Sequence, residues 1–254
     1  MKTWLSVLAA AAMIVACDGA TAPSSFKSTV DDSQVPAVLR AAYREDAARL
    51  ALRDLLASGY AEIPIPDEAV LPYYDALVLV YNATVLPARD TVVDVYQIHT
   101  FPMPVTRSLL MVVAGDQEWA QRLVHGEVPT GSAEVDGLLD AYALSLDRGH
   151  TLTTGELLIV LRSGVALNVA ALAPRFVGVP GVHSSQPNGA VGDGSDTRGS
   201  TDQSRVLLDY SVGYGDCPAG CIGRRFYHFA AHADGTVEYL GASGGGPPEP
   251  PPQP

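Results

Sequence analysis

Two cysteines separated by three residues, Cys217 and Cys221, carry the side chains best suited to chemistry in this chain. A disulfide between them would close a small ring, and Pro218 and Gly220 inside that ring favour the turn that it needs. An even pair of cysteines in an exported chain usually forms a disulfide. Loop-closure entropy assigns a ring of this size roughly 2 kcal/mol of stabilisation. We therefore predict a structural disulfide that fixes a hairpin corner.

The same two cysteines allow a metal or redox function as an alternative. Their Cys-Pro-x-x-Cys spacing resembles the ligand pair of thioredoxin-like copper-delivery proteins of the cell envelope, and thiolates suit Cu(I). In that family the motif lies between a strand and a helix, whereas here Ile222 leads into a predicted strand. The spacing also differs from the two-residue spacing of dithiol oxidoreductases.

A zinc site is the second alternative, because His228 and His232 extend the cysteine pair to a C-x3-C-x6-H-x3-H string. On a strand, residues four apart share a face but lie about 13 Å apart. Asp234 and Gly235 directly afterwards are typical of a two-residue hairpin turn, which favours a strand here. We therefore expect no metal at these residues and interpret both histidines as part of a partly solvated strand face.

A polar loop over residues 188–204 carries oxygen ligands that would suit Ca²⁺. Its spacing does not match the EF-hand pattern, so we interpret it as a plain flexible loop. The candidate ligands are Asn188, Asp193, Asp196 and Asp202.

Nucleophilic catalysis has one formal signal, because residues 241–245 read Gly-Ala-Ser-Gly-Gly and match the hydrolase pattern G-x-S-x-G. That pattern needs a strand before the serine and a helix after it, and here a Gly- and Pro-rich tail follows. We therefore interpret the match as accidental and predict no catalytic residues and no cofactor. No partner carboxylate or nucleophile can be assigned to the four remaining scattered histidines, His99, His125, His150 and His183.

The N-terminus has the layout of a secretory signal: Lys2, an apolar run from Trp4 to Ala16, and then Cys17. The order Ile-Val-Ala-Cys resembles the lipobox of bacterial lipoproteins. That resemblance implies a signal peptide over residues 1–16 and a lipid on Cys17, facing the periplasm or the exterior. An ordinary secretory signal is the alternative. Residues 17–33 are small, polar and aperiodic, and are predicted to tether the protein to the membrane.

The formal net charge of −12 argues against nucleic acid as a partner, because phosphate binding needs clustered Lys and Arg. Apolar residues make up 47% of the chain, which is enough for a substantial core. We predict one globular domain over residues 34–243. Residues 244–254 form a Gly/Pro-rich tail, which is predicted to be disordered because proline lacks the backbone N–H.

Hydrophobic periodicity predicts an α+β fold with a helix-rich N-terminal half, a β-α-β element and a C-terminal antiparallel β-meander. Helices are predicted at residues 36–57, 67–81, 116–124, 132–144 and 167–177. Strands are predicted at residues 91–100, 109–113, 157–161, 181–186, 206–214, 224–232 and 236–240.

The segment FVGVPGVHSSQPNG, residues 176–189, resembles the helix-to-strand passage of the inhibitory prodomains of subtilisin-type proteases. The resemblance covers about 35 residues. It implies that the β-α-β element is ferredoxin-like, and it makes a protease-inhibitor module one candidate function.

A wider resemblance covers the segments REDAARLALR, VVDVYQIHTFP and GYGDCPAGCIGRRFYHF. These segments are similar to parts of uncharacterised exported bacterial lipoproteins with a C-terminal disulfide corner and no known activity. Our leading hypothesis is therefore a non-catalytic, lipid-anchored binding or scaffolding protein of the cell envelope. It would contact the membrane through Cys17 and a protein partner through its surface. The alternatives are the protease-inhibitor module and the copper or thiol-redox protein.

Overall fold

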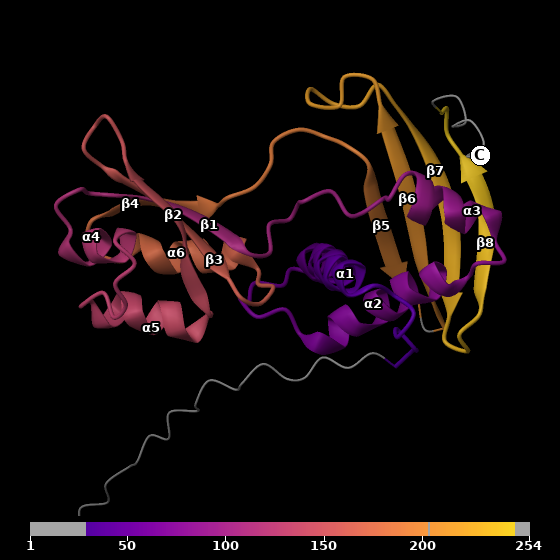
Figure 1. Ribbon diagram of the computed structural model, residues 1–254, viewed down its shortest axis with the longest axis horizontal. Helices are drawn as coiled ribbons and strands as arrows, with labels where there is room; N and C mark the ends of the chain where they lie inside the picture. Colours follow the sequence, from indigo (N-terminus) through magenta and orange to yellow (C-terminus); the bar gives the residue numbers. More distant parts are fainter. Residues whose placement is uncertain (1–28, 203, 247–254) are drawn as a thin grey trace, which may run out of the picture.

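A computed structural model describes residues 29–202 and 204–246 of the chain. These residues form two four-stranded antiparallel sheets, each with its own hydrophobic core, and the two sheets lie at opposite ends of the molecule (Figure 1). We call the two parts the β1–β4 lobe and the β5–β8 lobe. The predicted α+β fold is confirmed, and the predicted span of 34–243 contains both cores.

The β1–β4 lobe has a ferredoxin-like topology. Its strands run in the order β2-β3-β1-β4, and every neighbouring pair is antiparallel. Two helices connect β1 to β2 and one helix connects β3 to β4, which makes two split β-α-β units. The predicted β-α-β element is therefore present. The elements are β1 (Ser108–Val113), α4 (Glu118–Val124), α5 (Ala133–Ala141), β2 (Leu144–Thr151), β3 (Leu157–Ser163), α6 (Val169–Val177) and β4 (Val182–Pro187).

Strict alternation along β1 decides which face of this sheet is covered. Leu109, Met111 and Val113 are fully buried, whereas the residues between them are only partly buried. The buried set packs with side chains of all three helices, including Phe176 of α6. Because side chains on a strand alternate with period two, one face of the sheet holds the core and the other stays open.

The β5–β8 lobe is a meander with two long helices on one face (Figure 1). Its core joins residues of both helices to alternate residues of the strands, such as Leu208, Tyr210 and Phe229. Gly235, at positive φ, forms the predicted hairpin turn between the last two strands. The elements are α1 (Ala37–Ala57), α2 (Asp67–Asn82), β5 (Asp196–Thr201), β6 (Arg205–Tyr214), β7 (Gly223–His232) and β8 (Val237–Ser243).

The strand predicted over Thr91–Thr100 is wrong. The short helix α3 (Pro87–Asp90) continues into a π-helical turn over Thr91–Val95. The guanidinium of Arg89 pairs with the carboxylates of Asp90 and Asp94, and Val92 is fully buried in the core of the β5–β8 lobe. These tertiary contacts outweigh the β propensity of the branched residues.

Two strands lie where the sequence predicted none. Strand β5 occupies part of the predicted polar loop 188–204, and β2 directly follows α5. Both are edge strands with mostly polar or exposed side chains, so their pairing with β6 and β3 makes them strands. Among the described helices, none by itself has the length and hydropathy to cross a bilayer. Helix α2 and the segment Pro87–Val95 meet that criterion only together, and they are bent by 110°.

Candidate functional site

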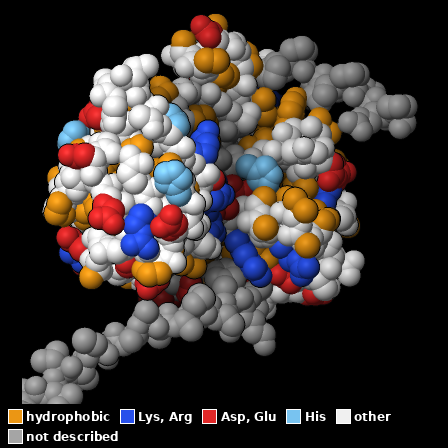
Figure 2. Space-filling view, turned by 60° about the vertical axis from the view of Figure 1, so that its left-hand side comes forward, with side chains coloured by type: hydrophobic (Ala, Val, Ile, Leu, Met, Phe, Trp, Pro, Cys, Tyr) orange, Lys and Arg blue, Asp and Glu red, His pale blue; other side chains and the backbone are white. Residues whose placement is uncertain are grey.

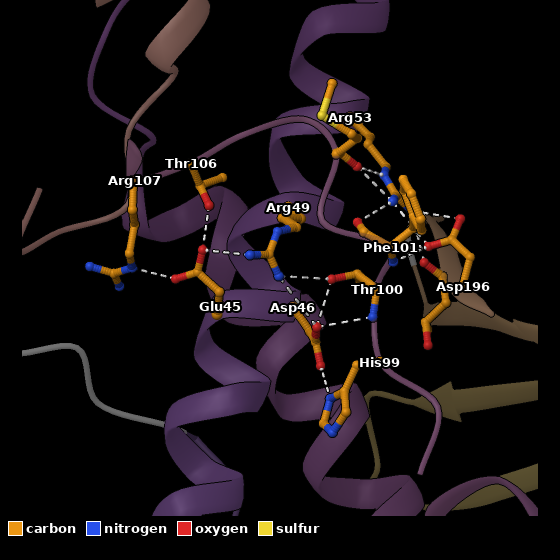
Figure 3. Close-up of polar contacts among 12 residues, drawn as sticks. Glu45, Asp46, Arg49, Arg53, His99, Thr100, Phe101, Thr106, Arg107 and Asp196 are labelled. Carbon is orange, nitrogen blue, oxygen red and sulfur yellow. Dashed lines mark hydrogen bonds and ion pairs between the residues drawn. The ribbon is translucent and has the colours of Figure 1, made fainter. Parts of the chain in front are cut away.

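The junction of the two lobes is built on a charged face of α1. Glu45, Asp46, Arg49 and Arg53 are spaced so that they project from neighbouring turns of the helix (Figure 3). They face the segment 98–107, which leaves the β5–β8 lobe and leads into β1. The polar face of α1 is therefore one place where the two lobes are joined.

Asp46 is the buried centre of this junction, with only 2% of its surface exposed. Its carboxylate accepts hydrogen bonds from the backbone N–H of Thr100 at 3.0 Å and from the Thr100 hydroxyl at 2.6 Å. The other carboxylate oxygen lies 2.5 Å from Nδ1 of His99. This hydrogen bond to Asp46 raises the pKa of His99 above its ordinary value. Asp46 therefore fixes the start of the crossing segment on α1.

Arg53 joins α1 to both segments that connect the lobes: the segment 98–107, which leads into β1, and the segment that leads from β4 to β5. Its guanidinium lies 3.0 Å from the carboxylate of Asp196 at the start of β5. It also donates to the carbonyl oxygens of Phe101 and Met103. Asp196 is itself buried and accepts from the backbone N–H of Phe101 at 2.7 Å. Arg53 thus holds the segment that leads into β1 and the start of β5 together on α1.

Glu45 bridges α1 to the first residues of the β1–β4 lobe. Its carboxylate accepts hydrogen bonds from the Thr106 hydroxyl and from Nε of Arg107. Arg49 donates to the same carboxylate at 3.0 Å. Burial acts to raise the pKa of Glu45, but the hydrogen bonds from Thr106 and Arg107 and the charges of the two arginines together lower it. Glu45 is therefore held as a carboxylate between two guanidinium groups.

A cleft of about 460 Å³ opens at this junction, between α1 and the near end of the β1–β4 sheet. Figure 2 shows basic side chains gathered along the line where the lobes meet. Arg49, Arg107 and Arg162 line the cleft, and Glu45 is its one acidic lining residue among the described residues. The lining therefore carries two more positive than negative groups in a chain whose net charge is −12.

The guanidinium of Arg162 is available in this cleft. It lies on the open face of the sheet beside Ser108, its cross-strand partner. Within residues 29–202 and 204–246 it has no hydrogen-bond or ion-pair partner. The Nε–H of Arg49 is buried and also lacks a partner in the described part of the chain. Buried donors are normally satisfied, so the cleft lacks acceptors rather than donors.

A larger groove of about 980 Å³ lies between the two long helices and the hairpins of β5–β8. Three of its carboxylates are already engaged by this chain. Asp54 accepts from the Tyr73 hydroxyl, Asp75 accepts from Thr29, and Asp202 pairs with Arg205 at 3.0 Å. The groove therefore offers less unsatisfied polar chemistry than the inter-lobe cleft.

Cys217 and Cys221 form the predicted disulfide, with their Cα atoms 3.9 Å apart. Asp193 supports the corner, because its carboxylate accepts from the backbone N–H of Cys221 and pairs with Arg224. Backbone hydrogen bonds from Gly194 and Cys221 lower the pKa of Asp193. In this oxidised form the pair has no thiolate to offer to copper.

The candidate calcium ligands of the 188–204 segment do not converge on one point. Asn188 donates to Ser108, Asp193 belongs to the disulfide corner, and Asp196 pairs with Arg53. Within the described ranges no group of three or more His, Cys, Asp or Glu side chains is arranged to hold a metal ion. Cys17, the predicted lipid-attachment site, lies outside the described residues.

Within the described residues, His228 and His232 do not form a metal site with Cys217 and Cys221. His232 lies 3.8 Å from the carboxylate of Glu238. His228 lies between two other side chains: its Nδ1 is 2.6 Å from Asp209 and its Nε2 is 2.7 Å from the Ser243 hydroxyl. The serine of the G-x-S-x-G match therefore does meet a histidine. Ser243 is the last residue of β8, and no helix follows it up to residue 246.

Sequence reasoning missed the junction and the histidine pairs because their partners are far apart in the chain. Asp46 and His99 are 53 positions apart, and Asp209 and His228 are 19 apart. One signal was present: four charged residues within nine positions on a helix that is otherwise rich in buried side chains. Such charges must find partners when the helix is buried, although the sequence does not name them.

No protein-family model, no curated protein and no solved structure matches this chain.

Proposed function

We propose that this chain is a lipid-anchored protein of a bacterial cell envelope that binds an anionic group in the inter-lobe cleft. The N-terminal layout with Cys17 supports the anchor, and the excess of positive charge in the cleft lining supports the binding role. The observation that carries the proposal is the Arg162 guanidinium, which faces a cleft at a lobe junction without a partner in the described chain.

A carboxylate or phosphate is the ligand group that fits this lining best. Arginine presents its N–H groups in a planar fork that matches two oxygens of such an anion. Arg107 is held in place by Glu45 and by the carbonyl oxygen of Gly164 at 2.7 Å, so it is already oriented before binding. Pre-orientation reduces the entropy lost on binding.

The size of the cleft limits what enters it. A volume of about 460 Å³ lies within the range of small-molecule sites, which are often found where two structural units meet. It therefore holds a small anion or the anionic end group of a larger envelope component. The acidic remainder of the surface repels polyanions such as nucleic acid.

Anion binding is expected to raise the melting temperature of the full-length protein in detergent. At ten times the dissociation constant, mass action contributes about 1.4 kcal/mol, which corresponds to roughly 3–6 °C for a chain of this size. Inorganic phosphate is the probe, added at constant ionic strength against chloride. Arg162→Gln should abolish this rise in melting temperature.

Arg148→Gln is the matched control, because Arg148 lies on β2 with 72% of its side chain exposed and does not line the cleft. It should keep the full response to phosphate. An equal rise in both variants would mean that phosphate acts on the protein surface in general, and it would contradict a site in the cleft.

The anchor is expected to be visible in the intact mass of protein extracted from membranes. The chain should begin at Cys17 and carry acyl groups, which hold a protein firmly when there are two or more. Reduction should add roughly 2 Da, the two hydrogen atoms of an opened Cys217–Cys221 disulfide. An unacylated mass would contradict the anchor, and free thiols would favour the copper or redox alternative.

A protease-inhibitor module is the second candidate. The ferredoxin-like order β2-β3-β1-β4 favours it, because this is the topology that the resemblance of residues 176–189 implies. Titration against a subtilisin-type protease separates the two candidates, since the anionic-ligand proposal expects no inhibition at micromolar protein.

A further inference from the structure

We propose that Ser243 and His228, positioned by Asp209, hydrolyse small carboxylic esters on the sheet face that α1 and α2 leave uncovered. The histidine lies between the other two side chains, with Nε2 at 2.7 Å from the serine hydroxyl and Nδ1 at 2.6 Å from the aspartate. This is the order of contacts found in Ser-His-Asp triads, which recur on unrelated folds and are recognised by geometry. The site lies on β6, β7 and β8, away from the residues that line the inter-lobe cleft.

The three side chains come from three consecutive strands of one sheet. Asp209 of β6 lies directly opposite His228 of β7. Ser243 of β8 lies opposite Phe226, two residues from the histidine on the same face. Antiparallel pairing fixes these positions, because neighbouring Cβ atoms on one face lie roughly 5 Å apart. The arrangement therefore depends on strand register and not on a flexible loop.

A β-bulge brings Ser243 to this face. Phe229 pairs with Tyr239, but His228 pairs with Gly241, so Leu240 is an extra residue on β8. Val237 and Tyr239 pack on the core beneath α1 and α2, and an unbroken alternation would send Ser243 to the same side. The extra residue reverses the alternation. Bulges of this kind re-aim side chains and are frequent next to active sites.

The glycines of the G-x-S-x-G match have a structural role here. Gly241 has a φ of +109°, and a Cβ added there would meet nothing within 4 Å, so β8 places no side chain over His228. Gly244 has a φ of +79°, and a Cβ there would lie 2.3 Å from the carbonyl oxygen of Arg224. Gly244 thus lets the chain pack against the backbone of Arg224, whereas the space beside Gly241 is open, so a substrate carbonyl can approach Ser243 from the Gly241 side.

The polarity of the hydrogen bonds fits a nucleophile and its base. With a proton on Nδ1, the neutral ring donates to Asp209 and leaves Nε2 free to accept the proton of the Ser243 hydroxyl. The Phe226 ring is stacked on the His228 ring, with centroids 6.1 Å apart and planes at 9°. This contact and the Asp209 hydrogen bond hold the imidazole in one orientation. Phe226 also offers an apolar surface beside Ser243.

The reaction proceeds in two steps: acylation of Ser243 and hydrolysis of the acyl-serine. Ser243 Oγ attacks the ester carbonyl carbon while its proton passes to Nε2 of His228, and the bond to the alcohol oxygen then breaks as that proton moves to the departing alkoxide. The serine is left acylated. Water gives a proton to Nε2, its oxygen attacks the acyl carbon, and the proton returns to Oγ as the carboxylic acid leaves.

The open sheet surface restricts the substrate class. The side chains of His228 and Asp209 are 30% and 48% exposed, so the site has no deep pocket to hold a long chain. A small ester with a short apolar acyl group, packed against Phe226, fits this surface. Exposed sites provide little binding energy, so we expect a high KM and hydrolysis that is detectable mainly with activated esters.

The test uses the full-length protein in detergent with p-nitrophenyl butyrate as substrate and a fluorophosphonate as covalent probe. The probe should lose fluoride and form a bond to Ser243, which peptide mass spectrometry locates. Ser243→Ala should abolish labelling. His228→Gln should lower the rate of ester hydrolysis at least 100-fold, the lower end of the usual contribution of a general base. Asp209→Asn should lower kcat and leave KM unchanged, as expected of a positioning residue.

Ser200→Ala is the matched control, because Ser200 is an exposed serine on β5 of the same sheet and has no histidine partner in the described chain. It should keep full labelling and full activity. Arg148→Gln should also keep the esterase activity, and neither labelling nor ester hydrolysis depends on phosphate binding, so failure of the anion site and failure of this inference are distinguishable. Hydrolysis that is unchanged in Ser243→Ala, or a label on other residues alone, would overturn the inference.

Discussion

Asp46→Ala is expected to lower the free energy of unfolding by about 3–5 kcal/mol, because it leaves buried polar groups without their acceptor. The Asp46 carboxylate accepts from the backbone N–H and the hydroxyl of Thr100 and contacts His99, and Arg49 lies 3.8 Å away. Thr100 is itself buried, so water cannot easily replace the lost bonds. Chemical denaturation followed by circular dichroism measures the loss.

Asp140→Ala is the control for this substitution. Asp140 is an exposed residue of α5, and its replacement should change the free energy of unfolding by no more than about 0.5 kcal/mol. Asp46→Asn should lie between the two, since an amide oxygen still accepts from Thr100. Equal stability of Asp46→Ala and the wild type would show that the junction does not depend on this carboxylate.

Phe229→Ala is expected to cost about 3–5 kcal/mol of unfolding free energy, because a fully buried aromatic side chain leaves a cavity. The ring packs edge-on against Tyr210, with centroids 5.6 Å apart, and lies 5.2 Å from the ring of Tyr239. These contacts join β6, β7 and β8 beneath the two long helices. Thermal or chemical unfolding of the full-length protein measures the effect.

Phe226→Ala is the matched comparison, since it removes the same side chain from the opposite face of the same strand. Phe226 is only partly buried, so its loss should cost about 1 kcal/mol or less. The difference between the two variants tests which face of β7 holds the core. A cost for Phe226→Ala as large as that for Phe229→Ala would mean that the outer face is covered as well.

The local spacing of apolar residues was sufficient to predict the helices and strands whose own side chains form the hydrophobic cores. The long helices α1 and α2 begin within one residue of their predicted starts, because apolar residues recur with helical spacing and Gly59 follows the first of them. Strands β1, β3, β6 and β7 were predicted from apolar or alternating runs. The Cys217–Cys221 disulfide was predicted because the two cysteines form a pair in a chain with an export signal, with Pro218 and Gly220 favouring the turn between them.

The elements that the sequence predicted wrongly or missed depend on partners elsewhere. The segment Thr91–Val95 is rich in β-branched residues, but the Arg89–Asp94 ion pair and the burial of Val92 make it helical. Strands β2 and β5 have little apolar character of their own and become strands at the edges of sheets built by their neighbours. The intrinsic β propensity of a short segment has less influence on its secondary structure than such tertiary contacts do.

By itself the sequence determined the α+β class, the disulfide corner, the acidic surface and the layout that predicts a lipid on Cys17. Each of these depends on residue types or on spacing within a few positions. Only the tertiary structure decided the inter-lobe cleft, the Asp46–His99 pair and the Asp209–His228–Ser243 contacts. These sites join residues that are far apart in the chain, and their geometry is set by strand register, a β-bulge and one buried helix face. Those features arise only when the sheets pair and pack, so no local pattern encodes them.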